Sequence, residues 1–115
     1  MSGYIKRDAE RPVSVAIAAS GTTSAAIDVR NFASGQLIMP ATITSTALTI
    51  HVCDTENGTF VPLYKDDGTT AVGIGSIAAS RAYQLPPEAL GGHWIKIVMG
   101  SSEGAARTLM LLLKG

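Results

Sequence analysis

The feature that most constrains this fold is a pair of alternating apolar runs that flank one polar turn, within residues 46–68. Leu, Ile and Val occupy alternate positions of 48–52, and Val61 and Leu63 alternate again within 60–64. Successive side chains of a β-strand point to opposite faces, so a period of two marks a strand with one buried face. The stretch therefore predicts a β-hairpin whose apolar side packs inward.

The same pattern recurs along the chain, with short apolar runs separated by Gly, Ser, Thr, Asn and Pro. Six further runs predict strands, at residues 13–17, 25–30, 36–39, 72–77, 93–99 and 107–114. We expect an all-β fold, an antiparallel two-sheet β-sandwich of jelly-roll type with about eight strands. The last run is apolar on both faces, which indicates a central strand or one whose second face a partner covers.

The length of 115 residues suits one domain with one core. Residues 1–12 contain five charges and no clean period, so we assign them to an N-terminal arm and residues 13–115 to the β-sandwich domain. The arm is either a frayed terminus or a segment that docks on a neighbouring subunit. Only 16% of residues are charged. Such a surface can lie against other proteins with little desolvation of charge, which suits assembly.

Charge and cysteine content exclude several partners. Nine basic residues balance nine acidic ones, so no overall field attracts nucleic acid or an anionic membrane. Cys53 is the single cysteine, which excludes an internal disulfide. The first twelve residues lack an apolar signal core, and no run approaches the ~20 residues that span a bilayer. We expect a chain that works in an aqueous compartment, without nucleic acid, membrane or cofactor.

Three patterns in the sequence are candidate sites for small ligands. Residues 73–78 fit a loose G-x-G-x-x-A dinucleotide pattern, but no helix signal follows it. Turn carboxylates offer hard oxygen ligands for Ca²⁺ at spacings that match no calcium loop, and turn formation explains them as well. They are Asp54, Glu56, Asp66 and Asp67. His51 and Cys53 project from one face of a strand, but two donors are too few for zinc.

The role of the single tryptophan has two explanations. Trp94 is the single tryptophan, and it is either a core or interface residue or a platform that stacks on sugars. Sugar sites usually group two or three aromatics, whereas this chain has six that are scattered. No Ser-His-Asp order, carboxylate pair or phosphate loop stands out, so we do not expect an enzyme.

The succession of strand and turn motifs resembles small virion structural proteins of tailed bacteriophages. The likeness covers roughly residues 12–114 and rests on the segments Gly35–Ala41, Thr46–Ile50, Gly58–Tyr64, Leu85–Glu88, Trp94–Ile97 and Arg107–Leu111. It implies a β-sandwich subunit of the virion, and first of all a capsid decoration or cement protein that binds the major capsid protein. It further implies a homo-oligomer, plausibly a trimer on a threefold axis, assembled in the host cytoplasm.

The resemblance carries no catalytic residue and implies only contacts between proteins. We expect these contacts to involve eight residues of the arm and of two strands: Tyr4, Ile5, Lys6, Arg7, Arg11, Trp94, Met110 and Leu112. Two alternatives remain open. One is a head-fibre base, neck or tail structural protein, and the other, from a different class, is a carbohydrate-binding jelly-roll module.

Overall fold

The computed structural model describes residues 10–115. Within this range the chain forms nine β-strands and one 3₁₀ helix, in the order β1 (Glu10–Ile17), β2 (Ile27–Asp28), β3 (Ser34–Ile38), β4 (Leu48–Cys53), β5 (Val61–Pro62), β6 (Gly73–Ile74), β7 (Ala82–Gln84), η1 (Pro87–Gly91), β8 (Trp94–Met99) and β9 (Arg107–Lys114). The described range contains no helix that is long and apolar enough to cross a bilayer.

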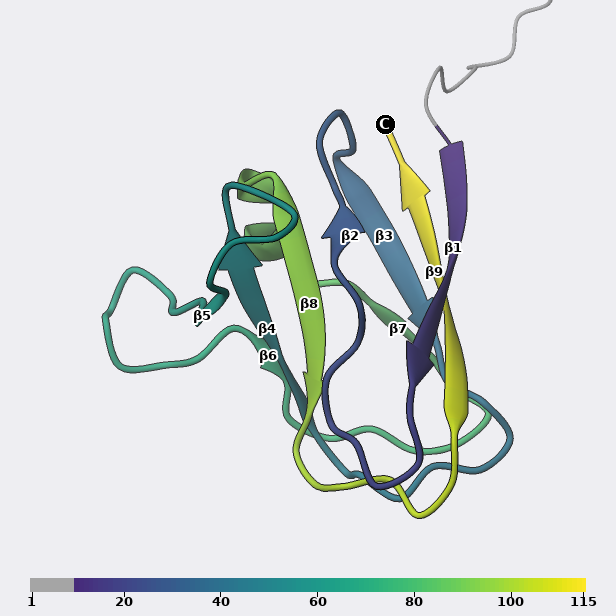
Figure 1. Cartoon of the computed structure of the whole chain (residues 1–115). Helices are drawn as coiled ribbons and strands as arrows, with labels where there is room; N and C mark the ends of the chain where they lie inside the picture. Colours follow the sequence, from purple (N-terminus) through teal and green to yellow (C-terminus); the bar gives the residue numbers. More distant parts are fainter. Residues whose placement is uncertain (1–9) are drawn as a thin grey trace, which may run out of the picture.

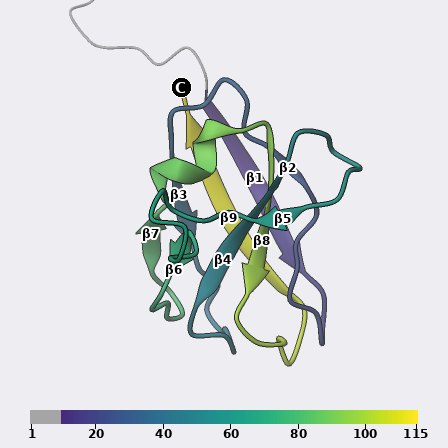
Figure 2. The same ribbon diagram turned by 90° about the vertical axis from the view of Figure 1, so that its left-hand side faces the viewer.

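The strands form two antiparallel sheets that pack face to face (Figures 1 and 2). Sheet A has the order β1-β9-β3-β7, and sheet B has the order β2-β8-β4-β5, with β6 also paired to β4. The pairs are nested, since β1 joins β9, β2 joins β8 and β3 joins β7, while β4 joins β5 and β6. The first half of the chain thus folds back on the second half, and successive pairs alternate between the sheets. This is a jelly roll, and the predicted all-β sandwich is confirmed.

The core lies between the two sheets and consists almost entirely of aliphatic side chains. Alternate residues of β4, β8 and β9 point into it, as the period-two pattern predicts. Twelve of the larger side chains buried in this core come from β1, β2, β3, β4, β8 and β9: Val15, Ile17, Ile27, Leu37, Leu48, Ile50, Ile95, Ile97, Met99, Leu109, Leu111 and Leu113. Burial of each such side chain contributes about 1.5–3 kcal/mol. The fold therefore needs no cross-link.

The edge of sheet B next to β4 is shared by two short strands. Ile50 donates its N–H to the carbonyl oxygen of Val72 at 3.0 Å and accepts from the N–H of Leu63 at 3.0 Å. The neighbour of β4 thus changes at Ile50 from β6 to β5, and residues 64–71 leave the sheet as a projecting turn, seen at the far left of Figure 1. Counting β5 and β6 as one position gives the eight positions of a jelly roll.

A buried carboxylate joins the loops at the end of the sandwich opposite η1. Glu103 is 1% exposed. Its oxygens accept from the backbone N–H groups of Thr44 (2.8 Å) and Ser45 (2.9 Å). They also accept from the Ser45 hydroxyl at 2.7 Å and the Arg107 Nε at 3.0 Å. Burial alone raises the pKa of this carboxyl, but these donors outweigh burial and lower the pKa to about 2.

Three expectations about the strands need correction. β1 begins at Glu10, so residues 10–12, which the sequence analysis assigns to the arm, lie in a strand. β2 contains two residues, although the alternation of residues 25–30 predicts a longer strand. Val61 was expected on a buried face, but it is 53% exposed. Local alternation cannot report whether a second sheet extends far enough to cover an edge strand.

Candidate functional site: the uncharged outer face of sheet A

The outer face of sheet A is centred on β9. Leu109, Leu111 and Leu113 point into the core and are fully buried, so the alternation turns Met110 and Leu112 outward, where each is half-buried. Because β9 has a neighbour on each side, β1 and β3, these two side chains lie in the middle of the face. The prediction that residues 107–114 form a central strand is therefore confirmed.

Uncharged residues flank this centre across the sheet, and Lys114 follows Leu112 on the same face of β9. The strand register forms two cross-strand rows, one of Pro12, Leu112, Gln36 and Gln84, and the other of Ser14, Met110, Ile38 and Ala82. We call these eight residues the uncharged face. Four strands ~4.8 Å apart and a length of about five residues give it an area of roughly 300 Å². The face is uncharged but mixed in polarity, since Ser14, Gln36 and Gln84 lie beside its apolar residues.

A polar hollow adjoins one end of the uncharged face. It has a volume of about 360 Å³ and is lined by Ser34, Gly35, Gln36, Gln84, Leu112 and Lys114. Gln36 and Gln84 lie directly opposite each other on β3 and β7. A side-chain amide both donates and accepts hydrogen bonds, so this end of the face can bind polar groups without a change of protonation.

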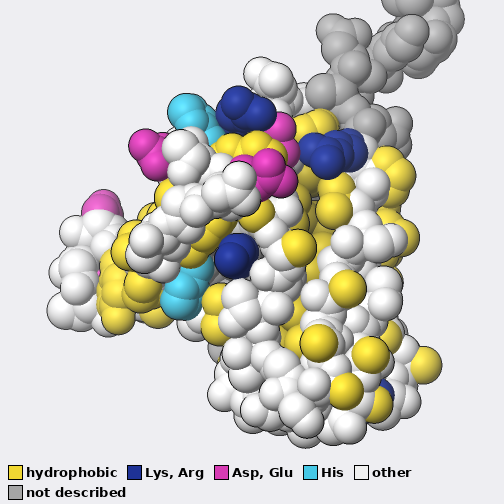
Figure 3. Space-filling model, viewed as in Figure 1, with side chains coloured by type: hydrophobic (Ala, Val, Ile, Leu, Met, Phe, Trp, Pro, Cys, Tyr) yellow, Lys and Arg dark blue, Asp and Glu magenta, His cyan; other side chains and the backbone are white. Residues whose placement is uncertain are grey.

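The outer face of sheet B differs in charge and in aromatic content. Trp94 and Lys96 point outward from β8, and each takes part in a cation–π contact. The guanidinium carbon of Arg30 lies 5.4 Å from the Trp94 ring centroid, and Lys96 Nζ lies 4.6 Å from the Phe60 ring centroid. In Figure 3 the charged side chains gather over this half of the molecule, while the visible surface over β1 and β9 is almost entirely uncharged.

Arg30 is held over Trp94 by a neighbouring carboxylate. Its Nε donates to Asp28 Oδ1 at 3.0 Å, and its Nη2 donates to Oδ2 at 2.8 Å. The side-chain hydrogen bonds from Arg30 are the main reason that the pKa of Asp28 falls to about 2. The same bonds raise the pKa of Arg30. A sugar that stacked on this side of Trp94 would have to displace an ion pair.

The structure brings together some of the predicted contact residues and separates others. Met110 and Leu112 lie side by side on the uncharged face, whereas Trp94 lies on the opposite sheet. Arg11 belongs to β1, and its Nη1 donates to the Asp28 carbonyl oxygen of β2 at 3.3 Å, across the edge of the sandwich. The other predicted residues, Tyr4, Ile5, Lys6 and Arg7, lie outside the described residues.

Ile38 belongs to the uncharged face but was not among the predicted contact residues. It is 36% exposed and lies directly opposite Met110. Its alternation with buried Leu37 was visible in the sequence. What the sequence did not show is that β3 and β9 are neighbours, because they are separated by about 70 residues along the chain.

A proline lies on one of the two edge strands of each sheet, Pro12 on β1 and Pro62 on β5. Leu85, the residue after β7, donates its N–H to the carbonyl oxygen of Gly35, so odd-numbered positions of β3 face β7. The ladder alternation then turns Pro12 of β1 away from β9. Leu63 donates to Ile50, so Pro62 faces away from β4. Proline has no N–H to offer an added strand. The edges thus disfavour strand addition, and contacts through side chains are favoured.

Among the described residues, the three candidate patterns for small ligands do not form a binding site. Within residues 10–115 no group of three or more His, Cys, Asp and Glu side chains is placed to hold a metal ion. Asp67 caps its own turn, where its carboxylate accepts from Thr69 and Thr70. Gly73, the first glycine of the dinucleotide pattern, lies in β6, where a Cβ would collide with the carbonyl oxygen of Leu48. This glycine serves strand packing.

Comparisons with known proteins identify the fold. No family model matches the sequence, and no curated protein sequence matches it. Among solved structures, the chain is similar to the crystal structure of SPBc2 prophage-derived protein YomS, with a TM-score of 0.56 and 13% sequence identity. The match covers 97% of this chain and 100% of that chain. At this identity the likeness establishes that the two chains share a fold over their whole length.

Proposed function

We propose that this chain is a structural component of a tailed bacteriophage virion and acts as a capsid decoration protein. In this proposal the uncharged face binds the major capsid protein, and the segment from Tyr4 to Arg7 adds further contacts. The observation that carries the proposal is the uncharged face itself, with Met110 and Leu112 at its centre. The origin of its structural neighbour, a prophage-derived protein, supports the phage context.

The physical role follows from the chemistry of this face. Covering it removes apolar side chains from water and desolvates no charged group, so protein contact gains the burial term without the cost of stripping a charge. A subunit that binds only the mature shell shifts the shell toward that state by mass action. Decoration would therefore stabilise the particle without any catalytic step.

The test uses two matched lysine substitutions and empty capsids of the phage that encodes the chain. Met110 and Val98 are both half-buried, outward-pointing residues on central strands, in sheets A and B respectively. We expect Met110→Lys to weaken binding to capsids at least tenfold, because it places a charge in the contact. Val98→Lys should bind as the unaltered protein does. Co-sedimentation across a concentration series measures both affinities.

The outcomes separate this function from its alternatives. Equal binding by the two variants would contradict a contact through the uncharged face. Binding to purified tails or necks in place of capsids would transfer the protein to the head-fibre, neck or tail class. Binding to a glycan panel that is lost in Trp94→Ala would identify a carbohydrate-binding module, which the Arg30 contact over Trp94 disfavours.

A further inference from the structure

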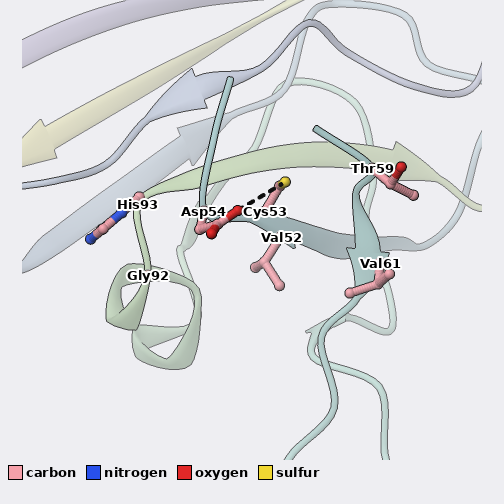
Figure 4. Close-up of a pocket in the computed structure, with 7 residues that line it drawn as sticks. All are labelled: Val52, Cys53, Asp54, Thr59, Val61, Gly92 and His93. Atoms are coloured by element: carbon pink, nitrogen blue, oxygen red, sulfur yellow. Dashed lines mark hydrogen bonds between the residues drawn. The ribbon is translucent and has the colours of Figure 1, made fainter. Parts of the chain in front are cut away.

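The loop that joins β4 to β5 contains the only Asn-Gly pair of the chain, Asn57 followed by Gly58. All residues from 54 to 59 are exposed, so water reaches both members of the pair. Figure 4 shows the two ends of this loop, Cys53 at one end and Thr59 at the other, beside an apolar hollow of about 480 Å³. The pair therefore lies in a solvated turn and not within a sheet.

The packing of the loop requires glycine at position 58. A Cβ there would lie 2.5 Å from both Cys53 Sγ and Thr55 Oγ1, which is closer than a Cβ comes to other heavy atoms in proteins. Gly58 thus has no side chain that could shield its backbone nitrogen. The same constraint that keeps the loop compact leaves this nitrogen sterically open.

The N–H of Gly58 and the side-chain amide of Asn57 are both free to react. In the described part of the chain, neither group takes part in a hydrogen bond that would first have to be broken. The second asparagine, Asn31, differs in this respect, because Phe32, which follows it, donates its N–H to the Val29 carbonyl oxygen at 3.4 Å. Phe32 also packs against the core, and its side chain crowds that nitrogen.

We propose that Asn57 is a site of spontaneous deamidation, with the Gly58 nitrogen as the nucleophile. This nitrogen gives its proton to hydroxide and bonds to the side-chain carbonyl carbon of Asn57. The bond from that carbon to the amide nitrogen breaks, and the amide nitrogen takes a proton from water and leaves as ammonia. Water then opens the cyclic succinimide at either carbonyl carbon, which gives aspartate or isoaspartate at position 57. Overall, water is consumed and ammonia is released, with no change of oxidation state.

The reaction would change both the charge and the length of the loop. Either product adds a carboxylate beside Asp54 and Glu56, the charged residues already present in this loop. Isoaspartate also inserts one carbon into the main chain next to Gly58, where there is no spare room beside Cys53 and Thr55. We therefore expect the modified loop to lose its compact packing. The site is independent of the proposed function, since the uncharged face belongs to the other sheet.

Mass spectrometry of the intact chain after ageing tests the proposal. The protein is held in mildly alkaline buffer at physiological temperature, together with a reference peptide of residues 55–60, until the peptide has converted. Fragment-ion spectra should then show the mass gain from amide to acid at Asn57 and not at Asn31. An isoaspartyl methyltransferase should label the aged protein, because it methylates isoaspartate and not asparagine.

A matched variant and two outcomes decide the question. Asn57→Ser keeps a turn-forming residue but has no side-chain amide, so the aged variant should show no mass gain at this position and no methyl label. An intact Asn57 in a sample whose reference peptide has converted would overturn the proposal. Equal conversion at Asn31 would overturn it as well, because the structure of the loop would then not select the site.

Discussion

The two outer faces of this sandwich share the same strand arrangement but differ in the side chains that they present. Each has a long central strand with alternate residues turned outward, β9 in sheet A and β8 in sheet B. The centre of sheet A presents Met110 and Leu112 among uncharged neighbours. Sheet B presents Trp94 and Lys96, and both are already engaged by Arg30 and Phe60 of the same chain.

This difference indicates which face is available to a partner. On sheet B, Arg30, which follows β2, lies over Trp94, and Phe60, from the loop before β5, contacts Lys96. The outward side chains of β8 therefore interact with other residues of the same subunit. On sheet A the neighbours of Met110 and Leu112 within each row belong to the same sheet, and Ile38, which lies opposite Met110, is 36% exposed. The more open face of sheet A is the one that we propose binds a partner.

The largest effect on stability should come from β9, where the adjacent residues Leu111 and Leu112 point to opposite faces of sheet A. Leu111→Ala removes a fully buried side chain beneath the uncharged face and should reduce the free energy of unfolding by about 2–5 kcal/mol. Leu112→Ala, one position on, should cost less than Leu111→Ala, because the Leu112 side chain is only partly buried and leaves no enclosed cavity. Urea unfolding with equal m-values measures both. Similar losses for the two variants would show that the outer face is structural.

An intermediate effect should come from the carboxylate that holds the two sheets in place. Glu103→Gln leaves the amide groups of Thr44 and Ser45 and the Arg107 guanidinium with a weaker acceptor, and we expect a loss on the order of 3 kcal/mol. Urea unfolding measures this loss, and an unchanged free energy of unfolding would contradict the structural role of Glu103.

The same carboxylate predicts a dependence on pH. Its pKa is lowered from 4.5 to about 2 in the folded protein, so the unfolded chain binds the proton first as the pH falls. The stabilisation is therefore complete above about pH 5 and is lost between pH 4.5 and 2. Thermal unfolding followed across that range should show a steeper loss in the unaltered protein than in Glu103→Gln. Parallel curves would contradict the role of this group.

The smallest effect should come from the contact that covers sheet B. Phe60→Leu keeps an apolar side chain over Lys96 but removes the aromatic ring, and it should cost about 0.5–1 kcal/mol. Phe60→Tyr retains the ring and serves as the control. Neither variant should bind capsids differently from the unaltered protein. A change in capsid binding by Phe60→Leu would mean that sheet B, and not sheet A, faces the partner.

Much of the fold could be predicted because apolar residues alternate along the longer strands. Leu109, Leu111 and Leu113 define the inner side of β9 by spacing alone, and the same holds for Ile95 and Ile97 in β8. The candidate site was predicted only in part. Met110 and Leu112 were expected at an interface, but Trp94 was grouped with them although the fold places it on the other sheet.

The sequence by itself determined the low charge, through composition, and the longer strands with their inward residues, through side-chain chemistry at a spacing of two; the short strand β7 was not predicted. Only the tertiary structure decided that Ile38 joins Met110 on one face, that Glu103 is a buried acceptor and that Val61 lies beyond the cover of sheet A. Those features depend on which strands become neighbours and where each sheet ends. Both are set by the summed packing of residues distant along the chain, which no local pattern contains.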